Sequence, residues 1–329
     1  MPRVIVVGGG WSGCAAAVAV AKLGVEVVLL ERTDMLLGTG LVGGLFRNNG
    51  RYTGAEEAIA MGAGEMIGVM DRAAIHTGVE FPKHHHGSLY DCRKVEGLAR
   101  QVLADFGVQT VLESRVVGVH RSGDRLTAVR LESGDAVEGK VFVDATGTAG
   151  SQANCARYGN GCVMCALRCP TFGKRVSVAA QAGVREMIAE RPGGLKGAMS
   201  GSAAVAKDTV AREIVAELQR TGSLVIPLPA VLQDRGSMQG KVCQQYSGEE
   251  FAANLVLIDN GNVKFIHPYF PLERLHRLDG FEAARYVDPY SGGTGNSIRF
   301  LGMAPRDDTL KVEGPANLYC GGEKAGIFV

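Results

Sequence analysis

The chain has 329 residues, of which 46% are hydrophobic and 21% charged, so it is long enough for a nucleotide-binding domain and a second module. Its 35 basic and 34 acidic residues leave a net charge of +1, which excludes a whole-chain electrostatic attraction to nucleic acid or membrane. The sequence shows no run of about 18 apolar residues and no signal-like N-terminus. We therefore expect a cytoplasmic protein whose eight cysteines are reduced thiols, metal ligands or redox groups.

A glycine-rich loop near the N-terminus predicts a dinucleotide-binding site. The β-branched run at residues 4–7 predicts a buried strand, and the spacing G-x-G-x-x-G follows it before a helix of small residues over 14–21. Gly8 would permit the tight turn, Gly10 the close approach of a pyrophosphate, and Gly13 the packing of helix on strand. The N–H groups at the helix N-terminus would then face the phosphates.

A second strand is predicted over residues 25–30, and it ends in Glu31. A carboxylate at the carboxyl end of this strand is suited to accept hydrogen bonds from an adenosine ribose. Glycine spacing by itself is weak evidence for a nucleotide site, because a glycine-rich turn can have a structural role alone. Strand, glycines, small-residue helix, strand and acid in this order indicate an α/β fold of the Rossmann type.

Two later segments favour FAD over NAD. Residues 140–147 predict a strand that runs into an Ala-Thr-Gly turn, as in flavoproteins with two dinucleotide folds. Residues 316–323 resemble the last motif of these flavoproteins, in which a strand delivers an acidic residue to the ribityl and pyrophosphate region of FAD. Glu323 stands at that position, and an NAD-only dehydrogenase lacks this arrangement. The predicted cofactor contacts are Gly8, Gly10, Trp11, Ser12, Gly13, Glu31, Arg32, Val116, Thr146, Gly147, Gly322 and Glu323.

With these motifs the sequence resembles a known group, the FAD-dependent oxidoreductases related to glucose-inhibited division protein A and the folate-dependent tRNA methyltransferase flavoproteins. The likeness covers the nucleotide motifs, the stretch 91–119 and a C-terminal block over 278–323, whereas residues 159–248 match no stretch of the tRNA enzymes. The resemblance implies bound FAD and flavin chemistry. It also implies a helix after the last motif that faces the flavin pyrimidine. Since the sequence stops at Val329, directly after that motif, either this helix is absent or the chain is incomplete.

The order of the motifs predicts a discontinuous FAD-binding domain with insertions. We expect residues 1–35, 93–150 and 310–329 to form a glutathione-reductase-like domain with two dinucleotide folds. A loop and helical insertion would occupy 36–92, and a mixed α/β substrate or cap domain would occupy 151–309. Finer patterns predict helices over 93–106 and 209–220 and strands over 109–112, 115–120, 126–131 and 137–143.

A cysteine cluster lies in the middle of the chain. Cys162, Cys165 and Cys169, with the proline that follows, have the spacing C-x2-C-x3-C-P, which matches the end of the bacterial ferredoxin motif. Cys155 would supply a fourth ligand. The pattern favours a [4Fe–4S] cluster, and a thiol redox pair, a zinc site and buried structural cysteines remain as alternatives.

Other groups have weaker signals. The three histidines at 84–86 would supply a metal ligand or a flavin-side proton donor, but adjacent side chains diverge and a polar loop is favoured. Cys92 precedes a helix whose dipole would stabilise a reactive thiolate. We nevertheless expect it to be a half-buried cap residue of that helix. Residues 288–296 would approach the isoalloxazine ring or form a surface loop. The basic residues between 168 and 196 would contact RNA phosphates, although a solvated face is favoured.

The sequence therefore predicts an FAD-dependent oxidoreductase that transfers hydride or electrons through the flavin, with an unassigned substrate and no assigned catalytic residue. Two alternatives remain open: a flavin-dependent tRNA-modification protein, and a non-catalytic flavin subunit of an electron-transfer complex. We expect a small-molecule substrate or a redox partner and no membrane partner. The net charge of +1 disfavours tRNA, and a homo-oligomer is left open.

Overall fold

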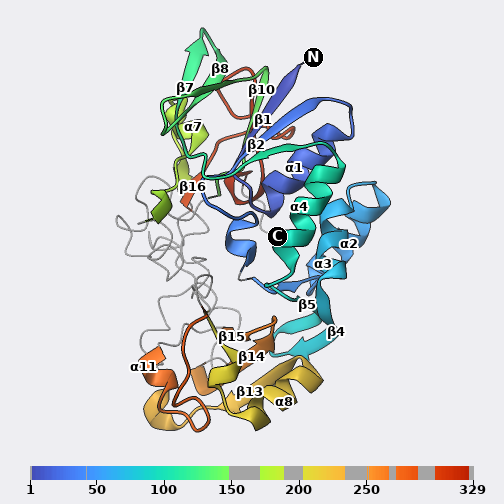
Figure 1. Cartoon of the computed structure of the whole chain (residues 1–329), viewed down its shortest axis with the longest axis vertical. Coiled ribbons are helices and arrows are strands. Elements are labelled where there is room, and N and C mark those ends of the chain that lie inside the picture. Colours follow the sequence, from blue (N-terminus) through green and yellow to red (C-terminus); the bar gives the residue numbers. More distant parts are fainter. Residues whose placement is uncertain are drawn as a thin grey trace.

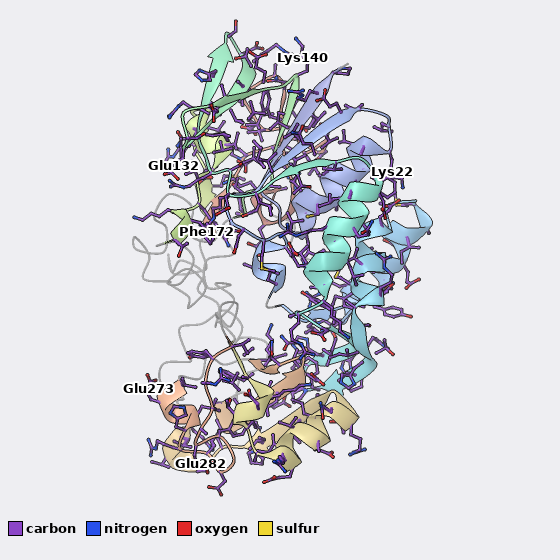
Figure 2. The ribbon with its side chains drawn as sticks, viewed as in Figure 1. Lys22, Glu132, Lys140, Phe172, Glu273 and Glu282 are labelled. Atoms are coloured by element: carbon purple, nitrogen blue, oxygen red, sulfur yellow. The ribbon has the colours of Figure 1, made fainter. Side chains whose placement is uncertain are left out.

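The molecule is elongated, with two units of strands and helices at opposite ends (Figure 1). In Figure 2, Lys140 marks the end of the molecule with the parallel sheet, and Glu282 marks the opposite end, which has an antiparallel sheet. The computed structural model describes residues 2–41, 43–147, 171–188, 203–233, 250, 252–266, 272–287 and 301–325.

A five-stranded parallel sheet forms the centre of the first unit. Its strands β1 (Arg3–Val7), β2 (Glu26–Leu30), β6 (Gln109–Val111), β10 (Val141–Asp144) and β17 (Leu318–Cys320) lie in the order β17-β10-β1-β2-β6. Each neighbouring pair is parallel. The strands come from three distant parts of the sequence, which we propose form one discontinuous domain, as the order of the motifs predicts.

Both faces of this sheet are covered, which explains why β1 and β2 are apolar at nearly every position. Val4 and Val6 of β1 pack against helices on one face. These helices are α1 (Trp11–Ala21), α3 (Glu65–Arg72) and α4 (Val95–Asp105).

Ile5 and Val7 point to the opposite face, because side chains alternate along a strand. There they pack against a small antiparallel sheet and a short helix. These elements are β7 (Val116–Ser122), β8 (Arg125–Leu131), β9 (Ala136–Glu138) and α7 (Val178–Gln181).

The segment between β2 and α4 contains strands as well as the expected loop and helix. It comprises η1 (Gly38–Leu41), β3 (Leu45–Phe46), α2 (Gly50–Ala60) and α3, followed by the hairpin of β4 (Ala74–Phe81) and β5 (His84–Tyr90). The hairpin packs against the second unit through apolar side chains of both strands, so it joins the two units.

The second unit is a four-stranded antiparallel sheet with a helix on it. Its order is β12-β15-β14-β13, and the strands are β12 (Ala203–Val205), β13 (Ser223–Pro227), β14 (Asn254–Asp259) and β15 (Val263–Ile266). The amphipathic helix α8 (Arg212–Thr221) contributes the buried Leu218 to its core. Shorter elements are η2 (Lys207–Thr209), η3 (Ala230–Leu232), α11 (Leu272–Leu275), the pair β11 (Met187–Ile188) and β16 (Leu301–Met303), and η5 (Gly322–Ala325).

Two expectations are wrong in detail. The predicted strand 137–143 is two strands, β9 and β10, because the chain leaves the small sheet for the parallel sheet at Gly139, where a methyl group would lie 2.6 Å from Ile5 Cγ1. The histidines at 84–86 begin β5 rather than a loop. Register shifts along the pair of β4 and β5 break the period-2 pattern that would have indicated strands.

Candidate nucleotide and substrate cavity

A cavity of about 730 Å³ opens at the carboxyl ends of β1 and β2, where ligands of open α/β sheets bind. Its volume lies within the roughly 300–1,000 Å³ of ligand clefts. The glycine loop, the N-terminus of α1, the loop from Leu37 to Gly43, helices α2 and α3, and β15 of the second unit all line it. The cavity therefore extends from the nucleotide motifs to the second sheet.

The three glycines of the motif have separate structural roles. Gly8 has a φ of +103°, and a methyl group there would lie 2.4 Å from the Ala145 carbonyl oxygen. A methyl group at Gly13 would lie 1.8 Å from the Gly8 carbonyl oxygen, so α1 can approach β1 only with glycine at this position. A methyl group at Gly10 would meet nothing within 4 Å, because this position borders the cavity.

The N-terminus of α1 is arranged to receive an anion. Its N-cap is Gly10, which makes no side-chain cap hydrogen bond, and its first turn has no acidic residue. Helix N-termini of this kind bind phosphates through their N–H groups and dipole. Gly321 and Gly322 pack against Ser12, because methyl groups there would lie 2.7 Å from its Oγ and Cβ atoms. The last motif and the first are thus in contact.

Glu31 connects the end of β2 to the glycine loop. Its side chain is buried, and Oε2 accepts a hydrogen bond from Gly9 N at 2.7 Å. Oε1 accepts from Thr33 N and from Thr33 Oγ1, both at 2.9 Å. A carboxylate has about four acceptor positions, so these three bonds leave one for a ribose hydroxyl.

Substitution of Glu31 should weaken FAD retention. We expect Glu31→Ala to retain the least FAD, Glu31→Gln more, and the wild type the most. Alanine removes acceptors from three donors, whereas glutamine keeps one acceptor oxygen and turns an NH2 group toward the remaining donors. We expect at least about tenfold weaker binding for Glu31→Ala, which is about 1.4 kcal/mol. FAD content after desalting and the dissociation constant of the reconstituted protein measure this. Equal retention by all three proteins would show that Glu31 is not a ribose ligand.

Asp144 is a positioning residue that the motif analysis missed. Its buried carboxylate accepts hydrogen bonds from Thr146 N and Oγ1 at 3.1 and 2.6 Å, and from Ala179 N at 2.8 Å. Its carbonyl oxygen accepts from Gly321 N at 3.1 Å. Asp144 thus holds the Ala-Thr-Gly turn, α7 and the last motif together. An acid at the end of an apolar strand is the signal that could have indicated it.

The predicted cofactor contacts line this cavity, apart from Gly13, which is buried on the side of α1 that faces Gly8. The predicted residues that line it are Gly8, Gly10, Trp11, Ser12, Glu31, Arg32, Val116, Thr146, Gly147, Gly322 and Glu323. The cavity also includes Tyr90 and Lys264, which no motif indicated. The lysine is recognisable as a charged residue within the apolar strand β15.

The histidines diverge, as expected for adjacent side chains. His84 lines the cavity, stacks on Phe81 with ring centroids 4.5 Å apart, and has its pKa lowered to about 4 by burial. Its Nδ1 lies 2.7 Å from Asn48 Nδ2. His85 is instead exposed and pairs with Glu80.

The thiolate hypothesis for Cys92 is wrong. Burial raises the pKa of its thiol to about 12, and Asn260 Nδ2 donates a hydrogen bond to its sulfur at 3.4 Å. The side chain is partly buried, as the prediction of a half-buried residue states. It is not the helix cap, however, because the N-cap of α4 is Lys94.

The cysteine cluster (Cys155, Cys162, Cys165 and Cys169) and the loop 288–296 lie outside the described residues. Within the described ranges, no group of three or more His, Cys, Asp or Glu side chains could hold a metal ion. The iron–sulfur cluster thus stays a prediction.

In the described ranges, no helix has the length and apolar composition that a membrane span requires. Of the basic stretch 168–196, Lys174 and Arg185 are exposed, whereas Arg175 lines the cavity.

This chain is similar to known proteins in both sequence and fold. A sequence model of the family glucose inhibited division protein A matches residues 3–233. The tRNA uridine 5-carboxymethylaminomethyl modification enzyme MnmG of Thermus thermophilus is 36% identical over 154 residues. The match covers 44% of this chain and 25% of that enzyme. This chain therefore spans only a part of that relative.

Two solved structures have a similar fold. GidA of Aquifex aeolicus superposes with a TM-score of 0.65 at 13% identity and covers 98% of this chain and 59% of its own. The Diels-Alderase PyrE3 superposes with a TM-score of 0.53 at 16% identity, covering 100% of this chain and 61% of its own. The family match extends over more than half of the chain and includes the glycine loop, Glu31 and the Ala-Thr-Gly turn. The chain belongs to the glucose-inhibited division protein A family of FAD-dependent flavoproteins.

Proposed function

We propose that this chain is the FAD-binding and substrate-facing part of a flavin-dependent enzyme that modifies a base of tRNA. The observation that carries the proposal is the single cavity that joins the nucleotide motifs to β15 of the second sheet. A cofactor held at one end of such a cavity faces a substrate admitted at the other. The matched relative is an enzyme that acts on a tRNA uridine.

The residues around the cavity fit FAD. The N-terminus of α1 would hold the pyrophosphate, Glu31 the adenosine ribose, and Glu323 the ribityl chain. When bound, FAD supplies hydride and electron transfer, and the protein supplies position and electrostatics. Flavin chemistry on the substrate therefore depends on what the remaining cavity residues admit.

The charge around the cavity supports a phosphate-bearing substrate. Basic side chains line it together with Glu31 and Glu323, although the whole chain is nearly neutral. A local excess of positive charge attracts phosphates even when the net charge is small, so the net charge of +1 was a poor argument against tRNA. The basic residues of the cavity are Arg32, Arg47, Arg51, Arg115, Arg175 and Lys264. Of these, Arg47 pairs with Glu56 and Asp71, and Arg115 pairs with Glu132, so the excess comes from the others.

Binding of tRNA to the FAD-loaded protein tests this proposal. Arg51 lines the cavity from α2, away from the nucleotide motifs, so Arg51→Gln should weaken binding and reduce the slope of log affinity against log salt by about 1. Lys140→Gln removes the same charge at the far end of the molecule and should change neither (Figure 2). The measurement is a filter-binding titration of unmodified tRNA over a series of salt concentrations.

Three results separate the candidate functions. Salt-dependent binding that Arg51→Gln weakens and Lys140→Gln does not would support an RNA substrate at the cavity. Equal weakening by both variants would place the RNA elsewhere on the surface and contradict the proposal. Stoichiometric FAD without tRNA binding would favour an oxidoreductase with a small substrate.

A further inference from the structure

His84 presents its imidazole ring to the cavity from the first position of β5. The ring stacks on that of Phe81, with centroids 4.5 Å apart and planes inclined by 25°. Its Nδ1 atom lies 2.7 Å from Nδ2 of Asn48, a residue that is 1% exposed. A stacking contact and a hydrogen bond together set the orientation of the ring.

The contact with Asn48 determines which nitrogen of His84 carries the proton. The NH2 group of an amide only donates, so Nδ1 accepts and the proton of the neutral ring is on Nε2. Burial, with a smaller contribution from the charge of Arg51, lowers the pKa of His84 to about 4, so the ring is neutral near pH 7. In the part of the chain that the structure describes, Nε2 has no hydrogen-bond partner, which leaves an N–H donor at the cavity.

The backbone on both sides of this contact is strained. Arg47, Asn49, Lys83 and His86 all have a positive φ, between 52° and 62°, although none of them is a glycine. Asn49 combines this φ with a ψ of −134°, which lies outside the left-handed helical region as well. Its N–H group donates to the His85 carbonyl oxygen at 2.9 Å, and its Oδ1 atom accepts from His85 N at 2.8 Å. Strain of this kind persists where such contacts enforce it, and it collects at ligand-binding sites.

The side chain of Asn48 has an unsatisfied acceptor. Its Oδ1 atom is buried and has no hydrogen-bond partner among the described residues. An unpaired buried acceptor destabilises a fold, and an apolar side chain of similar size would avoid that cost. Packing therefore does not explain an asparagine at this position. The contact of Nδ2 with His84 explains it, so Asn48 is a positioning residue for the imidazole ring.

His84 lies at the end of the cavity that faces the second sheet. Phe81, on which its ring stacks, belongs to one apolar cluster with Ile266 of β15, and Ile266 lines the cavity. The motifs for the ribose and the phosphates come instead from β1, β2, β10 and β17. A neutral N–H group is suited to an uncharged acceptor such as the carbonyl oxygen of a base, whereas Arg51, which also lines the cavity, is suited to a phosphate.

We propose that Nε2–H of His84 donates a hydrogen bond to a carbonyl oxygen of the substrate base, and that Asn48 fixes the tautomer that this bond requires. The inference rests on the proposed function, because it assigns the donor to the tRNA base that the cavity would admit. A donor that is fixed before binding loses little conformational freedom when the complex forms. Because the same donor would stay unpaired beside a base that lacks the carbonyl oxygen, His84 would also contribute to the choice of base.

Binding of unmodified tRNA to the FAD-loaded protein tests the role of His84. His84→Phe keeps a stacked ring and removes the donor, so the affinity should fall about tenfold. The slope of log affinity against log salt should stay unchanged, in contrast to Arg51→Gln, because no charge is removed. His84→Gln keeps an NH2 donor and should recover part of the affinity. The control His85→Phe changes the exposed neighbour, which pairs with Glu80 outside the cavity, and should bind tRNA like the wild type.

The NMR signals of the two imidazole nitrogens give a second readout, which needs no RNA. They should show the His84 proton on Nε2 in the wild-type protein at pH 7. Asn48→Leu removes the amide, so both tautomers should be populated and tRNA should bind more weakly, although Asn48 does not line the cavity. A purely structural role of Asn48 would change the unfolding temperature and leave the tautomer as it is.

Three results would overturn the inference. Wild-type affinity of His84→Phe for tRNA would show that the ring donates to no group of the base. A proton on Nδ1 in the wild-type protein would contradict the role of Asn48. Both of these results leave the proposed function standing, whereas absence of tRNA binding by the wild type would overturn the proposed function and this inference together. If His84→Phe fails to fold, the tautomer of the wild-type ring and the tRNA affinity of Asn48→Leu decide.

Discussion

Gly10→Ala is expected to give a folded protein that binds FAD at least about tenfold more weakly, a loss of about 1.4 kcal/mol or more. The backbone at Gly10 is extended, with φ −68° and ψ 175°, which alanine adopts without strain. Its methyl group would meet no protein atom within 4 Å, so the fold should not change. The methyl group would instead occupy the space through which a pyrophosphate approaches the backbone. Thermal unfolding of the FAD-free protein and FAD content after desalting measure the two effects.

Gly13→Ala should fail differently, although the two positions are three residues apart in one motif. The added methyl group would lie 1.8 Å from the Gly8 carbonyl oxygen, a backbone atom that cannot move without displacing α1 from β1. We expect destabilisation above about 4 kcal/mol, the range of exceptional single substitutions. Gly97→Ala, on the exposed face of α4 with open space around it, should retain FAD and gain about 0.5–1 kcal/mol. Equal unfolding temperatures and FAD content for the Gly10 and Gly13 variants would disprove the separate roles.

The nucleotide motifs were predictable because their structural causes are local. The apolar run of β1, the tight turn at Gly8 and the small residues of α1 follow one another within 21 residues of sequence. Each step is indicated by a short-range rule of strand, turn or helix formation. The same holds for Glu31, because it directly follows β2 and its hydrogen bonds go to Gly9 and Thr33.

The far side of the cavity was not predictable, because its causes are long-range. Lys264 reaches the cavity through a contact with Gly43, which is 221 residues away in the sequence. The strands β4 and β5 are visible only through their pairing and through their packing on β14 and β15. The break after β9, at Gly139, depends on the approach of Ile5 from a strand more than a hundred residues earlier. A single sequence has no local signal for any of these contacts.

The buried ion pair of Lys324 and Glu186 should contribute the largest single side-chain effect outside the glycine loop. Lys324 follows the last FAD motif directly, is fully buried, and donates to the Glu186 carboxylate and to the Gly302 carbonyl oxygen, the latter at 2.8 Å. The pair therefore fixes η5, which begins at Gly322, to the strand pair β11 and β16. Removing one partner of a buried pair leaves an uncompensated charge, which costs about 3–5 kcal/mol.

A double-mutant cycle separates the two charges. Glu186→Leu should destabilise more than Lys324→Met, because it leaves a fully buried ammonium group, whereas the Glu186 side chain is 12% exposed and keeps some contact with water. The double variant Glu186→Leu with Lys324→Met should recover most of the loss, since an apolar pair of similar volume replaces an ion pair at little cost. FAD retention should fall in the same order as stability across these variants, because the first two residues of η5, Gly322 and Glu323, line the cavity. Denaturant titration of the four proteins gives the coupling free energy. Additive losses in the double variant would show that the two side chains do not form a coupled pair.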